Sequence, residues 1–188
     1  MKMVSNGTGK QPYEQLEIEY ANYVNTAHAC VVNTGTAALH LAIEALKHAQ
    51  KYRYDSQVIV PDFTMYASGL AVYYARLNPV FIDCDDNLLI DLDKVEEYLE
   101  NQPDKNKTRI LMITHVYGRV VDMKRVDRIA KKYNLRVIED ACEAQGAAVG
   151  SYDIGCFSFY RNKIIHAEEG GIITSNDEEL INLCRDMR

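Results

Sequence analysis

A lysine that could act as a nucleophile, Lys163, lies in residues 157–165, Phe-Ser-Phe-Tyr-Arg-Asn-Lys-Ile-Ile. Its neighbours are mostly aromatic and aliphatic, and burial of an amine among such groups favours the uncharged form that attacks carbonyl carbon atoms. A surface lysine whose apolar stem covers these neighbours would give the same pattern. Residues 168–171, Glu-Glu-Gly-Gly, follow, and their glycines allow a tight reversal or a close backbone approach.

Two adjacent carboxylates, Glu139 and Asp140, follow a short apolar run at residues 136–138. Open α/β sheets bind their ligands at the carboxyl ends of parallel strands. Because successive strand side chains point to opposite faces, only one of the two carboxylates can face a given ligand, so a two-carboxylate glycosidase is not indicated. The pair could equally be the acidic start of a helix, favoured there by the helix dipole.

A small, hydroxyl-rich turn, residues 33–38 (Asn-Thr-Gly-Thr-Ala-Ala), separates an apolar run ending at Val32 from a helical pattern that begins near Leu39. Such a turn exposes unpaired amide N–H groups at the positive end of a helix dipole, where phosphate groups bind. A plain strand-to-helix turn with a threonine N-cap remains the alternative. The turn matches neither a Walker loop nor the dinucleotide-binding glycine motif.

These three features point to the same cofactor chemistry. Pyridoxal phosphate (PLP) needs a helix terminus for its phosphate and an amine for its aldehyde. It also needs a carboxylate that keeps its ring nitrogen protonated. Each feature is ambiguous by itself, but together they predict a PLP site.

The elements that must position these groups can be read from the periodicity. Short β-branched runs alternate with helical patterns, which predicts an α/β fold with a mostly parallel seven-stranded sheet and helices on both faces. Asp91 and Asp122 are predicted N-caps, Asn134 is a predicted helix end, and a last helix is expected to start at Asn176 with Glu179 in a capping box. The predicted strands are residues 29–32, 58–60, 80–82, 110–114, 136–138, 156–159 and 172–174.

Length and composition narrow the class of protein. The 188 residues suffice for one compact α/β unit, residues 1–188, and 21 basic against 27 acidic side chains give a net charge of −6, which argues against a nucleic-acid partner. Residues 1–7 turn polar too early for a secretory signal, and no membrane-spanning run is evident, so we expect a cytoplasmic protein. The five cysteines and five histidines lack metal-ligand spacing, so we expect free thiols and no metal site.

Several stretches, in collinear order, resemble the DegT/DnrJ/EryC1/StrS family of PLP-dependent sugar aminotransferases of fold type I. The resemblance implies that residues 1–188 are the large, PLP-binding domain, with the family's smaller C-terminal domain absent. It also implies a homodimer whose active sites are shared across the interface. The resembling stretches are residues 33–41, 58–64, 79–83, 115–118, 138–141 and 153–160, with Asn162 and Lys163.

The resemblance also implies roles for individual residues. Lys163 would condense with the cofactor aldehyde and move a proton between substrate and cofactor. Asp140 would pair with the pyridine nitrogen, and Glu143 would lie near the phenolic oxygen. The other implied cofactor-binding residues are Gly35, Thr36, Ala37 and Ser158 at the phosphate, and Met65 at the ring face, where the family usually has an aromatic residue.

The implied reaction transfers an amino group, typically from glutamate, to a nucleotide-linked keto sugar. The sequence departs from the family in a short loop between Gly146 and Ser151, and residues 166–171, His-Ala-Glu-Glu-Gly-Gly, replace the usual Thr-Thr-Gly-Glu-Gly-Gly. Two alternatives stay open. One is a PLP-dependent sugar dehydratase, whose members have histidine at the lysine position, although His166 is three residues out of register. The other is a truncated or non-catalytic domain of the same fold.

Overall fold

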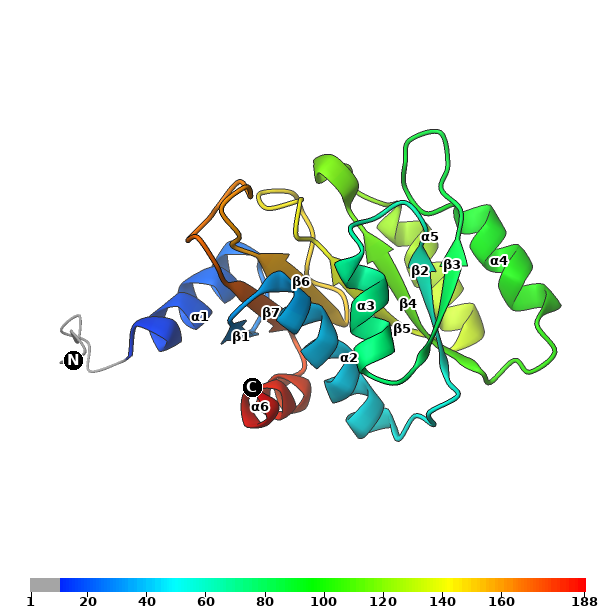
Figure 1. The fold of residues 1–188 in the computed structure, drawn as a ribbon, viewed down its shortest axis with the longest axis horizontal. Coiled ribbons are helices and arrows are strands. Elements are labelled where there is room, and N and C mark those ends of the chain that lie inside the picture. The colour runs from blue at the N-terminus through cyan, green and yellow to red at the C-terminus, as the bar shows by residue number, and fades with distance from the viewer. Residues whose placement is uncertain (1–10) are drawn as a thin grey trace.

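The computed structural model describes residues 11–188, so the expectation drawn from residues 1–7 lies outside the described part. Helices and strands alternate from α1 to β5 (Figure 1), as the periodicity predicted, but β5, β6 and β7 follow one another without a helix between them. The elements are α1 Pro12–Tyr23, β1 His28–Val32, α2 Gly35–Gln50, β2 Gln57–Pro61, α3 Ala67–Tyr74, β3 Asn78–Ile82, α4 Leu92–Asn101, β4 Thr108–Thr114, a 3-10 turn Val116–Gly118, α5 Met123–Tyr133, β5 Arg136–Asp140, β6 Ile154–Ser158, β7 Gly171–Ser175 and α6 Glu178–Met187.

Within residues 11–188 the strands form one seven-stranded sheet in the order β1-β7-β6-β5-β4-β2-β3. The pairs from β3 to β6 are parallel, whereas β7 is antiparallel to both β6 and β1. The predicted mostly parallel seven-stranded sheet is therefore confirmed.

The observed strands extend one or two residues beyond the predicted runs at one end or both, and β6 is shifted as well, since it spans Ile154–Ser158 rather than residues 156–159. Gly155 pairs with both neighbouring strands, so the ladder begins earlier than the apolar run suggested. A Cβ atom at Gly155 would lie 2.4 Å from Cα of Gly150, so glycine is needed here although it weakens the strand pattern.

The helices form layers on both faces of the sheet. Helices α2, α3 and α6 cover one face, and α1, α4 and α5 cover the other; α2 and α3 lie in front of the sheet in Figure 1. Along β4, Ile110 and Met112 pack into the first layer, whereas Leu111 and Ile113 pack into the second. Each such fully buried side chain contributes about 1.5–3 kcal/mol, which makes β4 a central strand of the core.

The predicted helix ends are mostly confirmed. Asp91 and Asp122 cap α4 and α5 through side-chain oxygens, and Asn134 ends α5 in the left-handed conformation. The predicted N-cap of the last helix was wrong by one residue: Asp177 accepts the amide of Leu180, while Asn176 accepts the amide of Ala27. Both side chains are good caps, so tertiary contacts decide which of them begins the helix.

Helix α6 packs back onto the sheet. Its residues Leu180, Ile181 and Cys184 are buried in the same core as α2. Beyond this apolar stripe, Arg185 and Arg188 both contact the buried carboxylate of Glu17 in α1. The last helix is thus held both by apolar burial and by the two ion pairs with Glu17.

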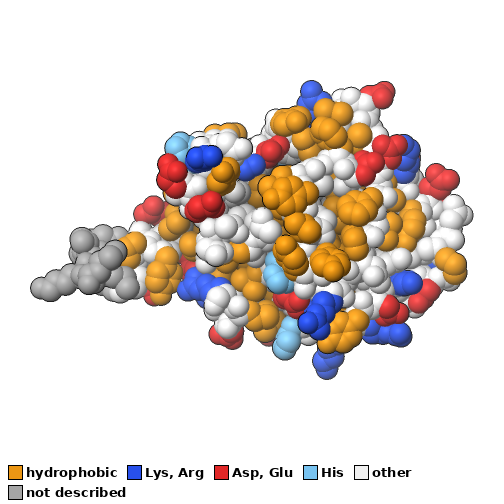
Figure 2. Space-filling view, in the orientation of Figure 1, with side chains coloured by type: hydrophobic (Ala, Val, Ile, Leu, Met, Phe, Trp, Pro, Cys, Tyr) orange, Lys and Arg blue, Asp and Glu red, His pale blue; other side chains and the backbone are white. Residues whose placement is uncertain are grey.

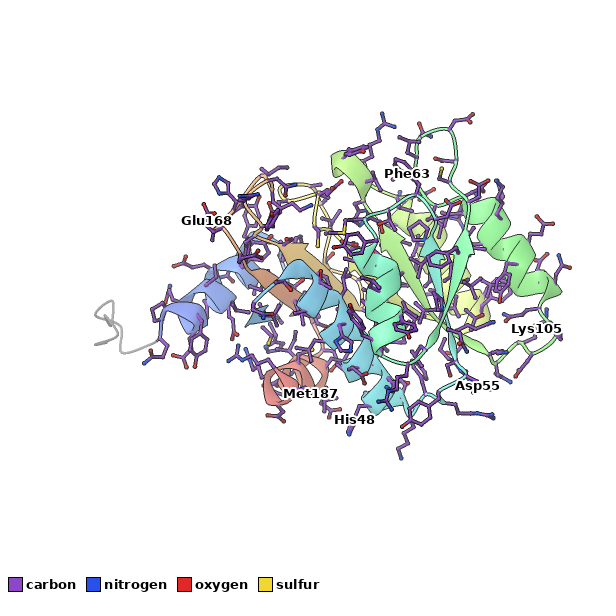
Figure 3. All side chains as sticks on the ribbon, viewed as in Figure 1. His48, Asp55, Phe63, Lys105, Glu168 and Met187 are labelled. Carbon is purple, nitrogen blue, oxygen red and sulfur yellow. The ribbon has the colours of Figure 1, made fainter. Side chains whose placement is uncertain are left out.

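The carboxyl ends of β1, β4, β5 and β6 meet at one edge of the sheet, together with the start of β7. Gly171 joins these ends, since it pairs with Val32 of β1 and with Ser158 of β6. Phe63 and Glu168 lie on loops at this edge, and Asp55 and Lys105 lie at the opposite edge (Figure 3). None of the helices within residues 11–188 has both the length and the apolar character of a transmembrane span.

Candidate active site

The turn between β1 and α2 has backbone amides that are available to an anion. Thr34 caps α2, because its hydroxyl oxygen accepts the amide of Ala37 at 3.0 Å and its carbonyl oxygen accepts the amide of Ala38. Among residues 11–188, the amide N–H groups of Gly35 and Thr36 have no hydrogen-bond acceptor. The threonine N-cap is therefore confirmed, and it leaves two amides that could bind an anion.

Gly35 lets the turn approach the end of β6. A Cβ atom at Gly35 would lie 2.7 Å from Cβ of Ser158, 3.0 Å from its hydroxyl oxygen and 3.2 Å from Sγ of Cys142. The structure thus brings the free amides of α2 and the Ser158 hydroxyl together, as predicted. Thr36 and Ala37 lie on the first turn of α2 and are half-buried.

Asp140 ends β5 with its side chain almost fully buried. One carboxylate oxygen accepts the hydroxyl of Ser68 at 2.7 Å, and the other accepts the amide of Cys142 at 3.2 Å. Thr64 and Thr114 extend this network, because the Thr64 hydroxyl oxygen lies 3.2 Å from those of Ser68 and Thr114. These hydrogen bonds hold the carboxylate of Asp140 in one orientation.

Glu139 points to the opposite side of β5, as strand alternation predicted. It accepts hydrogen bonds from the backbone amides of Gly150 and Tyr152 and lies 3.1 Å from Nε2 of His115. Burial opposes the charge of this carboxylate, but the three hydrogen bonds outweigh it and lower the pKa of Glu139. The prediction that only one of the two carboxylates faces the site is consistent with these contacts.

Lys163 lies in the loop after β6, and its ammonium nitrogen is 3.3 Å from Oε1 of Glu143. The lysine side chain is only 15% exposed and that of Glu143 is 32% exposed, so the amine does not extend into bulk solvent. The other oxygen of Glu143 accepts the amide of Tyr117 at 3.1 Å. This burial does not favour the alternative of a surface lysine whose apolar stem covers its neighbours while its amine reaches solvent.

Gln145 connects the loop that carries Lys163 to the end of β6 through two hydrogen bonds. Its amide nitrogen donates to the carbonyl oxygen of Ser158 at 2.8 Å, and its carbonyl oxygen accepts the amide of Ile165 at 2.6 Å. Gln145 is buried, so these bonds are shielded from water. The sequence analysis did not single out Gln145.

The thiol of Cys142 lies among the predicted site residues. Burial raises its pKa strongly, the charge of Asp140 adds to the rise, and the charge of Lys163 acts in the opposite direction. Its sulfur also lies beside Gly35. Gly35, Asp140 and Lys163 are thus all near the side chain of Cys142.

Other predicted features are less closely tied to this cluster. Met65 is 53% exposed, and its sulfur accepts the amide of Ala67 at 3.2 Å.

In the described part of the chain, Asp62, Asp83 and Cys84 bring three potential metal-ligand atoms within 4.8 Å of one another. Asp83 already pairs with Lys94, so this group is a solvent-facing charged cluster.

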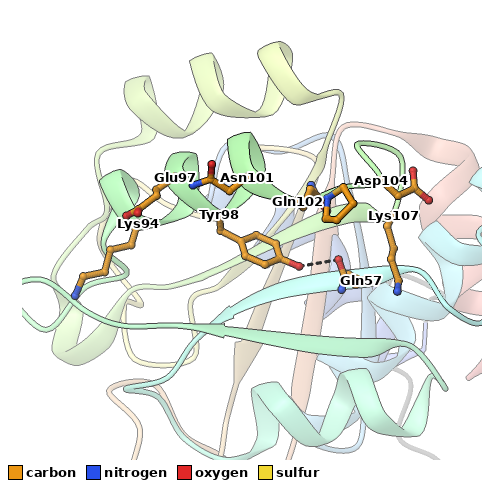
Figure 4. Close-up of a pocket in the computed structure, with 9 residues that line it drawn as sticks. Gln57, Lys94, Glu97, Tyr98, Asn101, Gln102, Asp104 and Lys107 are labelled. Atoms are coloured by element: carbon orange, nitrogen blue, oxygen red, sulfur yellow. Dashed lines mark hydrogen bonds between the residues drawn. The ribbon is translucent and has the colours of Figure 1, made fainter.

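A surface pocket of about 510 Å³ lies at the other edge of the sheet, where β2 and β4 begin (Figure 4). Tyr98 crosses it and donates its hydroxyl to Gln57 at 2.8 Å. This pocket is remote from Lys163, since the strands that begin beside it end at the edge that carries the candidate site.

A model of the DegT/DnrJ/EryC1/StrS aminotransferase family matches residues 3–188. The chain belongs to this family. It is 38% identical to the GDP-perosamine synthase of Caulobacter vibrioides over 181 residues, which cover 93% of this chain and 46% of that protein. It is 37% identical to the UDP-N-acetyl-3-dehydro-alpha-D-glucosamine 3-aminotransferase of Acidithiobacillus ferrooxidans, covering 92% of this chain and 47% of that protein.

Among solved structures, NtdA of Bacillus subtilis with bound cofactor PMP is similar to this chain, with a TM-score of 0.83 and 31% identity. The similarity covers 93% of this chain and 39% of that protein. This DegT/DnrJ/EryC1/StrS chain therefore spans about half the length of the curated relatives it matches.

Proposed function

We propose that this chain is the cofactor-binding large domain, residues 1–188, of a PLP-dependent nucleotide-sugar aminotransferase. The observation that carries the proposal is the shielded amine of Lys163, which lies beside Glu143 at the sheet edge that also holds Asp140 and the α2 turn. Family membership supports an aminotransferase. The whole reaction is part of the proposal, because the chain spans about half of its relatives.

The residues at this edge fit PLP. The free amides of Gly35 and Thr36 and the hydroxyl of Ser158 form a donor set for a phosphate, with Ala37 on the same helical turn, and the missing Cβ atom at Gly35 lets these donors lie close together. Asp140 would hold the ring nitrogen, and Met65 would pack on the ring through its polarisable thioether. When bound, PLP supplies an aldehyde that takes up an amino group and a ring that withdraws electrons from the substrate carbon.

The chain's own groups can manage the protons of this reaction. The ammonium of Lys163 donates to Glu143, so the carboxylate can take a proton from Nζ and return it without exposing the amine to solvent. The Asp140 carboxyl group, oriented by the hydroxyl of Ser68, would pair with a cationic ring nitrogen. Electrostatic preorganisation of this kind avoids reorganisation during the reaction.

The names of the relatives support a nucleotide-linked sugar as the substrate class. The Acidithiobacillus relative is named for a UDP-linked dehydro sugar and the Caulobacter relative for a GDP-linked amino sugar. We therefore include a nucleotide-linked keto sugar as acceptor and glutamate as amino donor in the proposal, together with a cytoplasmic location.

A homodimer is also part of the proposal. Exposed hydrophobic side chains gather over and around α3 (Figure 2), and few monomers expose such a patch without a partner. A second copy of the chain covering it would also border the candidate site. The exposed side chains of this patch are Phe63, Met65, Tyr66, Tyr73, Tyr74 and Phe81.

The test is to incubate the purified chain with PLP, trap the covalent adduct with borohydride and map the modified peptide. We expect the adduct at Lys163, and amino transfer from glutamate to a nucleotide-linked keto sugar. A Lys163→Ala variant that forms the adduct at the wild-type level would refute the assignment of the amine. An adduct without turnover would favour a non-catalytic domain, and cofactor that binds but cannot be trapped would favour a dehydratase.

A further inference from the structure

A buried histidine–glutamate pair lies on the face of β5 that Asp140 does not use. The side chains of His115 and Glu139 are 0% and 2% exposed, and Nε2 of the histidine is 3.1 Å from Oε2 of the glutamate. The other ring nitrogen, Nδ1, accepts the amide of Val121 at 3.2 Å. Nδ1 therefore carries the lone pair, and Nε2 carries the hydrogen that is donated to Glu139. The ring thus connects the backbone at Val121 to Glu139 in β5.

The pair ties the loop after β5 to the loop after β4. Glu139 accepts the amides of Gly150 and Tyr152 at 2.9 and 2.7 Å, so it holds the far end of the loop that begins at Asp140. On the other side, His115 donates its own amide to the carbonyl oxygen of Asp140 at 3.0 Å. Removing either member would leave buried polar groups without partners, which is costly in a dry interior.

The segment that His115 closes, residues 115–121, carries the amide that orients the site carboxylate. Tyr117 has a φ of 53°, a left-handed conformation that non-glycine residues adopt only when surrounding contacts impose it. In this conformation its amide donates to Oε2 of Glu143 at 3.1 Å, while Oε1 of the same carboxylate faces Lys163. The bond from Val121 to His115 spans this strained turn and closes it.

We propose that His115 and Glu139 are positioning residues that hold the Tyr117 amide in place and thereby aim the Glu143 carboxylate at Lys163. They act through Glu143 and touch neither the amine nor a ligand. The inference rests on the proposed function only where Lys163 is taken as the amine that reacts with the cofactor. The coupling itself is a property of the chain without cofactor and is tested there.

The experiment measures how readily Lys163 reacts with a small amine reagent, acetic anhydride at trace concentration, in the cofactor-free chain. Mass spectrometry gives the labelling of Lys163 relative to Lys51, an exposed lysine at the opposite edge of the sheet. Glu143→Gln removes the ion pair and should raise this ratio about fivefold. His115→Asn keeps an acceptor for Val121 but loses the donor to Glu139, and we expect it to raise the ratio about threefold.

The decisive comparison is a double-mutant cycle. If His115 acts through Glu143, His115→Asn changes the ratio in the wild-type chain but not in the Glu143→Gln background. Val95→Ala, which truncates a fully buried side chain in α4, is the control for general destabilisation and should leave the ratio unchanged. The Cys142 thiol and the Asp140 carboxylate, which belong to the same cluster, stay the same in all variants.

Two results would overturn the proposal. One is a folded His115→Asn protein with the wild-type labelling ratio; the other is an equal rise in both backgrounds. Glu139→Gln offers the same test if the histidine variant does not fold.

Native-state hydrogen exchange on the wild-type chain needs no variant: the amides of Tyr117 and Val121 should open with the same free energy, and independent opening would refute the coupling. Absence of a PLP adduct at Lys163 would refute the proposed function and leave this result intact.

Discussion

Gly171→Ala tests whether the turn at the start of α2, which we propose binds the phosphate, depends on the close approach of β7. A Cβ atom at Gly171 would lie 2.3 Å from the carbonyl oxygen of Thr34, 2.6 Å from its carbonyl carbon and 2.9 Å from the amide nitrogen of Gly35. All three neighbours are backbone atoms of the turn that begins α2, so no flexible side chain can move to relieve the overlap. The turn or the start of β7 must shift.

The magnitude follows from overpacking. Inserting a methyl group into a well-packed region costs about 1–3 kcal/mol, and we expect Gly171→Ala to reach the upper part of that range because backbone must move. The same shift would turn the Gly35 and Thr36 amides away from a bound phosphate. Loss of one hydrogen bond to a charged group costs about 1.5–3 kcal/mol, which corresponds to at least a tenfold rise in the PLP concentration needed for half-maximal adduct at Lys163.

Urea unfolding followed by circular dichroism gives the first quantity, and titration of the trapped adduct gives the second. Gly69→Ala is the matched control: its Cβ atom would meet only ring atoms of Phe81, at 3.1 and 3.2 Å, and that ring is 55% exposed and free to move. Gly69 is helical, so alanine there should be neutral or stabilising. A Gly171→Ala protein with wild-type stability, or with reduced stability but unchanged PLP titration, would refute the reasoning.

Three further predictions concern buried polar groups. Ser68→Ala removes the hydroxyl that donates to Asp140 and should cost about 1–3 kcal/mol of unfolding free energy and weaken adduct formation; unchanged values in both assays would contradict this. Because the pKa of Glu139 is lowered from 4.5, the stability that its charge contributes is complete above that pH and is lost as the pH falls further, so urea midpoints of Glu139→Gln should depend less on acid than those of the wild type. Glu17→Ala should cost about 1–3 kcal/mol and speed hydrogen exchange in α6, because its partner Arg185 lies in that helix and its partner Arg188 follows it; equal exchange would show that apolar burial alone holds the helix.

The sheet was predictable because its signals are local. Most strands contain a short apolar run with β-branched residues, and Lys163 was chosen as a candidate because it stands among apolar neighbours in the sequence itself. The hydrogen bond from Ser68 to Asp140 was not predictable, since it joins residues 72 positions apart and a serine inside an apolar helix carries no pattern of its own. Pairs such as His115 and Glu139 likewise arise only when β4 and β5 lie side by side.

Strand register explains how two adjacent carboxylates come to have different surroundings. β4 and β5 pair in parallel with Thr114 opposite Asp140 and Ile113 opposite Glu139, so alternation directs Asp140 toward Ser68 and Thr64, and Glu139 toward His115. A slip of one residue would exchange the two faces and leave a buried carboxylate without its donors. The apolar residues Val137 and Ile138 would change layers at the same time, so the burial that forms the core also prevents the slip. The identity of the carboxylate at the site is therefore set by the hydrophobic pattern of β5 as much as by the site itself.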